Sequence, residues 1–386
     1  GETRRRRQWG FAACGDFGSP ATTIRPACAG IRWAYARLAF TKGKTVFKIA
    51  AATLLALGLA MPAVAEITAI RAGRVITDAA QPARGASTIL VENGRIIEIN
   101  DAAAALPAGA KVIDLSGKTV MPGLIDAHVH LTGTPDSQFW QEAVTTDEYS
   151  VAVGLANAAT TLRAGFTTVR DLGSGRLSGF AVRDAIANGI ATGPRTLVSG
   201  PAISIIGGHG DVSGYRPEVN AALAMGNTCT GAEQCAARVR EASRAGADVI
   251  KITATGGVLS QQARGLGQHF TDAEMRAIVT TAHGLGLKVA AHAHGARGIE
   301  AAANAGVDSI EHGTFADAAA IQAMVNNKTW YVPTLMAMVG IEERLGKGTY
   351  TPVVEAKVRE TLAQRGKALA AAIKAGVRIA YGTDSA

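Results

Sequence analysis

Two histidines separated by one residue stand at the end of a short apolar segment near residue 124. His128 and His130 lie in the sequence Gly-Leu-Ile-Asp-Ala-His-Val-His of residues 123–130. Residues two apart on an extended strand point to the same face. The two imidazoles therefore face one point, as two ligands of one metal ion must. His-x-His alone is a weak signal, so the prediction of a metal site depends on further ligands at the ends of other strands.

Further residues of the metal-ligand type follow at the ends of later apolar segments. They are His292, His294, His312 and Asp384. Lys251 lies inside another apolar segment, 248–252, where a charged amine is costly unless it is neutralised or paired. His292 and His294 are again two residues apart, so either of them could be the ligand.

The elements that must position these residues can be read from the hydrophobic pattern after residue 120. Short apolar segments alternate there with alanine-rich amphipathic segments, which indicates parallel strands joined by helices. The predicted strands are 124–129, 167–171, 195–199, 249–252, 288–292, 309–311, 330–334 and 378–381. The predicted helices include 147–164, 232–245, 271–284, 296–305 and 355–375.

Eight such strands predict an α/β fold, a (β/α)8 TIM-type barrel of about 250 residues. Active sites lie at the carboxyl ends of the strands in these barrels, so the candidate ligands should converge there. The glycine-rich run 201–231 has no regular pattern and is expected to form a loop over that face.

Residues 66–121 have a different pattern, with short strands expected at 67–70, 74–77, 88–91, 95–99 and 111–115. Asn93 and Gly94 predict a tight hairpin turn, because both readily adopt positive φ angles. This segment is expected to be a small antiparallel β unit, distinct from the barrel of residues 122–386.

The His-x-His, the strand-four lysine, the later histidines and the final aspartate resemble the motifs of the amidohydrolase superfamily, over residues 67–386. The resemblance implies two divalent metal ions, commonly Zn²⁺, bridged by a lysine carboxylated on its side-chain nitrogen. One ion would be held by His128, His130, carboxylated Lys251 and Asp384. The other would be held by Lys251, His292 and His312. The β unit before the barrel would be half of an N-terminal β-sandwich.

The segments 251–258 and 291–295 are most similar to the Xaa-Pro dipeptidase and arginine/lysine carboxypeptidase branch, often called imidazolonepropionase-like. This branch includes hydrolases of N-acyl amino acids, among them amide-linked mycotoxins. The resemblance implies cleavage of an amide bond in a dipeptide or N-acyl amino acid by a metal-activated hydroxide, with Asp384 as the catalytic base. Substrate contacts are expected from His294, His209 and Arg264. His209 could instead make a structural hydrogen bond, and Arg264 could be a solvated loop residue.

Two alternatives remain open at this point. The same site could act on a cyclic amide, an ester or a phosphotriester. The chain could also be a non-catalytic periplasmic binding protein on a retained barrel. Single-metal deaminases are disfavoured, because they lack the bridging lysine.

The net charge of +8 does not indicate a nucleic-acid partner. Residues 1–65 hold 10 of the 39 Lys and Arg and 2 of the 31 Asp and Glu, so the remainder carries 29 of each and no net charge. The expected partner is a small molecule or a dipeptide, and association into a homo-oligomer is left open.

Residues 46–65 have the basic start, short apolar core and Ala-x-Ala end of a signal peptide. The apolar run is shorter than the roughly 20 residues of a membrane span. A periplasmic or secreted location is therefore expected, residues 1–45 are expected to be non-native, and the barrel is expected to be C-terminally truncated. In an oxidising compartment, Cys229 and Cys235 could form a local disulfide or remain as free surface thiols.

Overall fold

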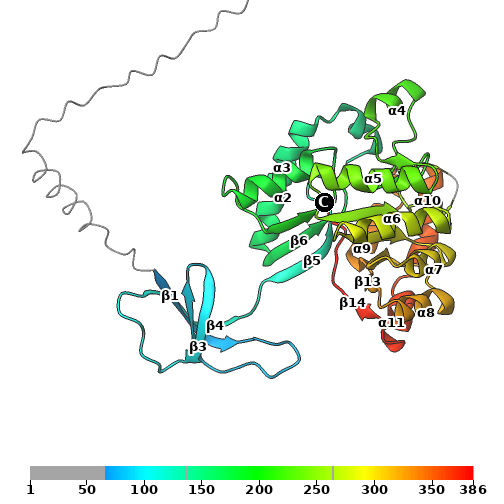
Figure 1. Cartoon of the computed structure of the whole chain (residues 1–386). Coiled ribbons are helices and arrows are strands. Elements are labelled where there is room, and N and C mark those ends of the chain that lie inside the picture. The colour runs from blue at the N-terminus through cyan, green and yellow to red at the C-terminus, as the bar shows by residue number, and fades with distance from the viewer. Residues whose placement is uncertain (1–65, 135–136, 263–264, 386) are drawn as a thin grey trace, which may run out of the picture.

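The computed structural model describes residues 66–134, 137–262 and 265–385. The chain forms an N-terminal β-sheet, coloured blue to cyan in Figure 1, followed by a larger unit of alternating strands and helices. Every helix in the described ranges is too short or too polar to span a lipid bilayer.

The N-terminal sheet consists of four strands in the order β3-β2-β1-β4. They are β1 (Ile67–Val75), β2 (Ser87–Glu92), β3 (Arg95–Asp101) and β4 (Lys111–Val120). The hairpin between β2 and β3 is confirmed, with φ of 50° at Asn93 and 73° at Gly94.

Two predictions for this sheet are wrong. The sheet is mixed rather than antiparallel, because β4 pairs with β1 in parallel. The two strands predicted at 67–70 and 74–77 are the single strand β1, whose pairing with β4 shifts register beside Gly73. A Cβ at Gly73 would lie 2.2 Å from the carbonyl oxygen of Ser116, so only glycine lets the strand continue past that point.

The larger unit is an α/β fold of the TIM-barrel type. Its eight parallel strands all begin at or within one residue of the predicted positions. They are β5 (Leu124–Val129), β6 (Phe166–Asp171), β7 (Arg195–Val198), β10 (Val249–Thr253), β11 (Lys288–Ala293), β12 (Ser309–His312), β13 (Trp330–Val332) and β14 (Arg378–Ile379). Strands β5 to β7 form one parallel sheet and β10 to β14 form another.

Backbone contacts link the two parallel sheets on both sides. Ile203, after β7, bridges to Ile252 of β10. Ser385, after β14, bridges to Val129 of β5. The carboxyl ends of the first and last strands are therefore neighbours, which brings residues more than 250 positions apart into one place.

Helices lie along the outside of the parallel strands (Figure 1). They are α2 (Asp147–Arg163), α3 (Ser178–Ala187), α4 (Pro217–Leu223), α5 (Ala232–Ala245), α6 (Asp272–Gly284), α7 (Ala296–Ala305), α8 (Ala318–Asn326), α9 (Leu335–Glu343), α10 (Pro352–Leu362) and α11 (Lys367–Lys374), with a 3₁₀ helix η1 (Phe139–Val144). Helix α6 begins with a capping box, in which Thr271 and Glu274 each accept a hydrogen bond from the other's main-chain N–H.

Two segments differ from the prediction in this outer layer. The helix predicted over 355–375 is divided into α10, which ends at Leu362, and α11, which begins after Gly366. The φ of 74° at Gly366 is incompatible with a continuous helix. The run 201–231 is not wholly irregular, since it contains α4 and the short paired strands β8 (Ser204–Ile205) and β9 (Thr228–Cys229). Cys229 and Cys235 form a buried disulfide at the end of this run and are not surface thiols.

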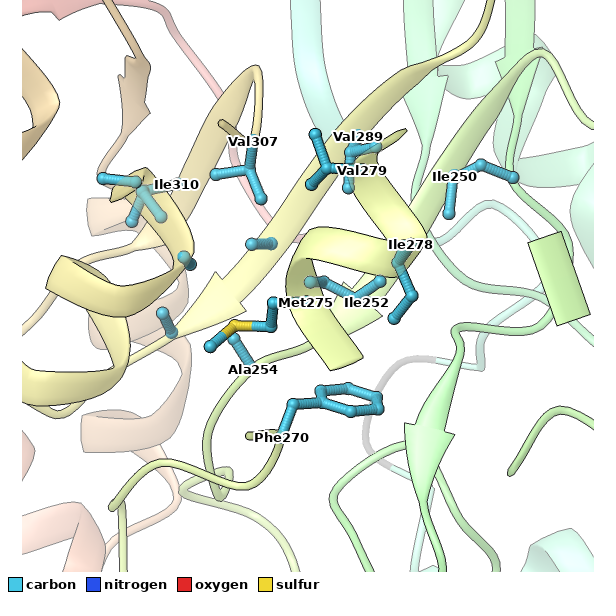
Figure 2. Packing of buried hydrophobic residues seen from close by; sticks show 14 of the residues in the cluster. Ile250, Ile252, Ala254, Phe270, Met275, Ile278, Val279, Val289, Val307 and Ile310 are labelled. Atoms are coloured by element: carbon cyan, nitrogen blue, oxygen red, sulfur yellow. The ribbon is translucent and has the colours of Figure 1, made fainter. Parts of the chain in front are cut away.

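The largest hydrophobic core lies between the parallel strands and their helices (Figure 2). Ile252 of β10 packs in it with Met275 and Ile278 of α6, and all three side chains are fully buried. Burying a side chain of this size contributes about 1.5–3 kcal/mol. Such packing holds the strands in place, so the residues at their carboxyl ends are carried on a rigid support.

Candidate metal centre

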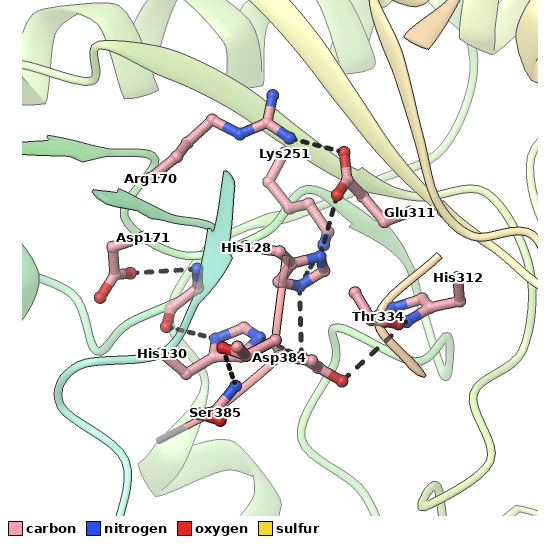
Figure 3. Close-up of polar contacts among 12 residues, drawn as sticks. His128, His130, Arg170, Asp171, Lys251, Glu311, His312, Thr334, Asp384 and Ser385 are labelled. Atoms are coloured by element: carbon pink, nitrogen blue, oxygen red, sulfur yellow. Dashed lines mark hydrogen bonds and ion pairs between the residues drawn. The ribbon is translucent and has the colours of Figure 1, made fainter. Parts of the chain in front are cut away.

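Five of the polar residues predicted on or at the ends of the strands lie close together in Figure 3: His128, His130, Lys251, His312 and Asp384. The carboxylate of Asp384 lies 3.2 Å from Nε2 of His128 and 3.2 Å from Nε2 of His130. Its other oxygen lies 3.9 Å from Nδ1 of His312. Nζ of Lys251, on β10, lies 3.4 Å from Nε2 of His128.

The donor atoms form two overlapping clusters of metal-ligand spacing among the described residues. One cluster contains His128, His312 and Asp384, and the other contains His292, His294 and His312. Within each cluster the ligand atoms lie within 4.8 Å of one another. His312 belongs to both, so the geometry brings the two groups side by side and leaves both His292 and His294 as candidate ligands.

Burial keeps most of these imidazoles neutral. It lowers the pKa of His128 and of His294 to about 4, and the pKa values of His292 and His312 fall well below the usual range for the same reason. Neutral imidazole is the form that binds a metal ion, so these side chains need not lose a proton first.

The charged members of the centre have shifted pKa values as well. Burial lowers the pKa of Lys251 to about 8. At His130, burial lowers the pKa, but the hydrogen bond and charge of Asp384 outweigh burial and raise it. At Asp384, burial acts upward, but the surrounding histidines, first of all His128, hold the pKa well below its usual range. The aspartate is therefore ionised at neutral pH.

A buried ion pair that the sequence reasoning missed supports His128. Glu311 accepts a hydrogen bond of 2.9 Å from Nδ1 of His128. Its other oxygen accepts one of 2.9 Å from Arg170, and Glu311 itself has no exposed surface. With Nδ1–H committed to Glu311, the lone pair of His128 lies on Nε2, the atom that faces Asp384 and Lys251. A charged residue inside the apolar strand 309–311 was the available signal, as it was for Lys251.

The backbone is strained at three positions of the centre. The φ angles of His312, Thr334 and Asp384 are 70°, 46° and 62°, in the left-handed region that non-glycine residues rarely adopt. Thr334 belongs to the centre because its hydroxyl lies 2.7 Å from Nδ1 of His312. Such conformations cost of the order of 1–3 kcal/mol each and concentrate at functional sites. At His312 the consequence is direct. Adjacent strand residues normally face opposite sides, yet Glu311 and His312 both reach the centre.

Asp126 ties the segment after β14, which carries Asp384, to the first parallel strand. It accepts hydrogen bonds from the main-chain N–H and hydroxyl of Thr383, at 3.1 and 2.7 Å, and from the N–H of His128. The N–H of Asp384 in turn donates to the carbonyl of His128 at 2.8 Å. The carboxylate of Asp384 is therefore held beside His128 and His130 by contacts independent of a metal ion.

The predicted substrate residues have different outcomes. The ring centroid of His209 lies 4.2 Å from that of His292, which places His209 beside the second cluster. Its Nδ1 is 2.6 Å from the hydroxyl of Ser260. His294 is in the second cluster, with Nδ1 2.8 Å from the hydroxyl of Thr314. Arg264 lies outside the described residues.

The donor set suits divalent transition metals. Zinc prefers imidazole nitrogen and carboxylate oxygen, and the centre offers several neutral imidazoles around one ionised carboxylate. Nδ1 of His128 is hydrogen-bonded to Glu311, and Nδ1 of His130 is hydrogen-bonded to the carbonyl of Gly173. These contacts fix the orientation of each ring and leave its Nε2 available to bind a metal ion. The residues present therefore fit a metal centre.

A model of the amidohydrolase family matches residues 119–386. The chain belongs to this family. Among its relatives is the ochratoxinase of Aspergillus niger, 33% identical over 342 residues that cover 83% of this chain and 70% of the relative.

Solved structures agree with this assignment. A Xaa-Pro dipeptidase with methionine bound in its active site superposes with a TM-score of 0.75 at 35% identity, covering 83% of this chain and 79% of the dipeptidase. The structure of the A. niger ochratoxinase gives a TM-score of 0.73 at 30% identity, covering 83% and 76%. The resemblance to the amidohydrolases and to the dipeptidase branch is thereby confirmed.

Proposed function

We propose that this amidohydrolase cleaves the amide bond of a dipeptide or N-acyl amino acid and releases the C-terminal amino acid. The observation that carries the proposal is the pair of donor clusters that share His312. Lys251 lies next to His128, and the carboxylate of Asp384 lies 3.2 Å from the same histidine. The similarity to a Xaa-Pro dipeptidase and to ochratoxinase supports the choice of substrate class.

The centre is proposed to hold two divalent ions, expected to be Zn²⁺. His128, His130 and Asp384 would bind one, and His292 and His312 the other. Lys251, carboxylated on Nζ, would bridge the two. Its depressed pKa supports this role, because only the neutral amine reacts with CO2. Bound ions would supply a hydroxide near neutral pH and polarise the scissile carbonyl.

Asp384 is proposed to carry the proton in the reaction. Its carboxylate is ionised, is held by main-chain contacts to β5 and lies at the centre of the site. It would accept a proton from the attacking water and deliver it to the nitrogen of the leaving amine, as a general base and then a general acid.

His209 and His294 are proposed to bind the carboxylate of the substrate. Both are neutral, since burial lowers their pKa values to about 3 and about 4, so each would recognise a carboxylate by a hydrogen bond rather than by charge. Arg264 remains a candidate for the ionic contact.

We also propose that the parallel strands form a closed (β/α)8 barrel, that the N-terminal sheet is half of a β-sandwich, and that the mature protein is periplasmic or secreted. The Cys229–Cys235 disulfide supports the last point, because disulfides persist in oxidising compartments.

The test is a hydrolysis screen of the zinc-loaded protein. The panel would contain Xaa-Pro dipeptides, N-acyl amino acids, their C-terminal amides, a lactam, an ester and a phosphotriester. Release of amino acid from the first two groups is expected, with much slower release of the amino-acid amide from the C-terminal amides. Turnover confined to the lactam, ester or phosphotriester would show that the proposed substrate class is wrong and that the enzyme acts on that other class. Two bound metal ions with no turnover of any compound would favour a binding protein.

A further inference from the structure

Lys357, on α10, has a buried ammonium group whose contacts are all on one loop. It is only 6% exposed, and Nζ donates to the main-chain carbonyls of Gly257, Ser260 and Gln262 at 3.0, 2.6 and 3.3 Å. An ammonium has three N–H donors, so these three carbonyls use all of them. Burying a charge is costly unless it is hydrogen-bonded, and here the three carbonyls offset that cost. The same hydrogen bonds organise the loop that follows β10.

Apolar packing holds the same loop against the same helix. Val354 and Val358, on either side of Lys357 on α10, form a buried cluster with Val258 and Leu266. The loop position is therefore determined by α10, an element remote in sequence from the metal ligands of β10 and β11.

The loop in turn contacts His209. The hydroxyl of Ser260 lies 2.6 Å from Nδ1 of His209. Gly257 lies so close under the ring that a Cβ there would be 2.1 Å from the same nitrogen. Two of the three residues that Lys357 gathers thus face one side of the His209 ring, while His292 lies 4.2 Å from it, centroid to centroid.

We propose that Lys357 is a positioning residue for substrate recognition. It draws in the loop 257–262 so that the hydroxyl of Ser260 donates a hydrogen bond to Nδ1 of His209. The ring proton is then held on Nε2, where it can be donated to the substrate carboxylate. The substrate contact rests on the proposed function. The fixed tautomer does not, and it can be measured without turnover.

The first experiment measures the tautomer directly. Long-range ¹H–¹⁵N spectra of the full chain, labelled with ¹⁵N-histidine, report the protonation of both ring nitrogens. The chain has eight histidines, and His209→Asn identifies the signal of interest. The unchanged protein should show a single His209 tautomer with the proton on Nε2, and a ring protonated on Nδ1 would overturn the proposal. Ser260→Ala and Lys357→Met should move both nitrogen shifts toward the average of the two tautomers.

Two further variants sharpen this measurement. Lys357→Gln keeps part of the donor capacity without the buried charge, so it tests the proposal even if the methionine variant does not fold, and an intermediate shift is expected. Thr351→Val is the matched control. It removes another hydrogen bond to this loop, 3.0 Å long, from Thr351 to the side chain of Gln261, and should leave His209 unchanged. Unaltered His209 shifts in the lysine variants, or equal shifts in the control, would overturn the proposal.

The second experiment measures KM and kcat with an N-acyl amino acid. Ser260→Ala and Lys357→Gln should each raise KM about fivefold with little change in kcat, the size expected for one neutral hydrogen bond. The double variant should be no worse than the worse single one, because both act through His209. If the KM increases of the two single variants multiply in the double variant, Lys357 acts independently of Ser260 and His209, and the proposal is wrong. Absence of turnover in every form would refute the proposed function and leave the spectroscopic result to decide this inference.

Discussion

Replacing Arg170 by methionine should strongly destabilise the protein, because it leaves a buried anion without its cation. Glu311 is fully buried, and its carboxylate accepts hydrogen bonds from Arg170 and His128. Arg170 also donates to the carbonyl of Ala127 at 2.6 Å and to the hydroxyl of Ser309 at 3.1 Å. Methionine has a similar length but supplies none of these contacts.

The pKa of Glu311 gives the size of the effect. Burial alone would raise it, but the charge of Arg170, followed by the hydrogen bond and charge of His128, lowers it from 4.5 to about 2. At about 1.4 kcal/mol for each pKa unit, this difference corresponds to about 3 kcal/mol. The folded-state pKa is the lower one, so this stability is present above pH 4.5 and is lost as the pH falls toward 2. Loss of one partner of a buried pair typically costs about 3–5 kcal/mol.

The two members of the pair should not be equivalent. Arg170 lines a cavity of about 570 Å³ near the amino ends of the strands and is 17% exposed, so water can reach it. Glu311 has no such access. Glu311→Gln should therefore cost only about 1–2 kcal/mol, since Gln still accepts from His128 and the free guanidinium can be hydrated.

Urea unfolding of the metal-free protein at pH 7 would measure both variants. The expected order of stability is wild type, Glu311→Gln, then Arg170→Met. The difference between Arg170→Met and wild type should shrink as the pH falls from 4.5 toward 2, the range in which the wild type loses the stability of its ionised Glu311. An Arg170→Met variant within about 0.5 kcal/mol of wild type, or one more stable than Glu311→Gln, would refute the reasoning.

Three other substitutions or conditions test separate parts of the site and fold. Asp384→Asn should retain part of its metal, by elemental analysis, but lose about 10²–10⁴-fold in turnover, and near-normal turnover would defeat its role as base. Burial lowers the pKa of Lys251 to about 8, so about ten times more of its amine is neutral at pH 9 than at pH 7. Reactivation of metal-free protein by zinc and a fixed concentration of CO2 should therefore be about tenfold faster at pH 9. Equal rates at the two pH values would contradict carboxylation of the neutral amine. Replacing Cys229 and Cys235 by alanine should lower the free energy of unfolding by about 2 kcal/mol, which is the loop-closure value for a separation of 6 residues. An unchanged midpoint of urea unfolding would exclude this contribution.

The sequence alone was sufficient for the layout of the α/β unit and for the residue types of its centre. Strand and helix periods are local, so β5 and α5 could be assigned from their own residues. The carboxyl ends of parallel strands meet on one face, so His128 and Asp384 could be placed together although 256 positions separate them.

Other features depended on contacts that no local pattern contains. The parallel pairing of β4 with β1 and the break at Gly366 follow from which segments meet in space and from one backbone angle. The charge of Glu311 inside a strand is visible in the sequence, but its partners Arg170 and His128 are brought to it only by the fold.

The same limit applies to the outer parts of the centre. From spacing alone, His292 and His294 were equivalent, and Lys357 was one lysine of an amphipathic helix. The tertiary structure brings both histidines into one cluster with His312 and surrounds the lysine with three carbonyls of the β10 loop. The residue types of the centre and their positions at strand ends can be read from short stretches of sequence. Their orientation was decided by long-range hydrogen bonds and burial, because these exist only once distant segments have packed together.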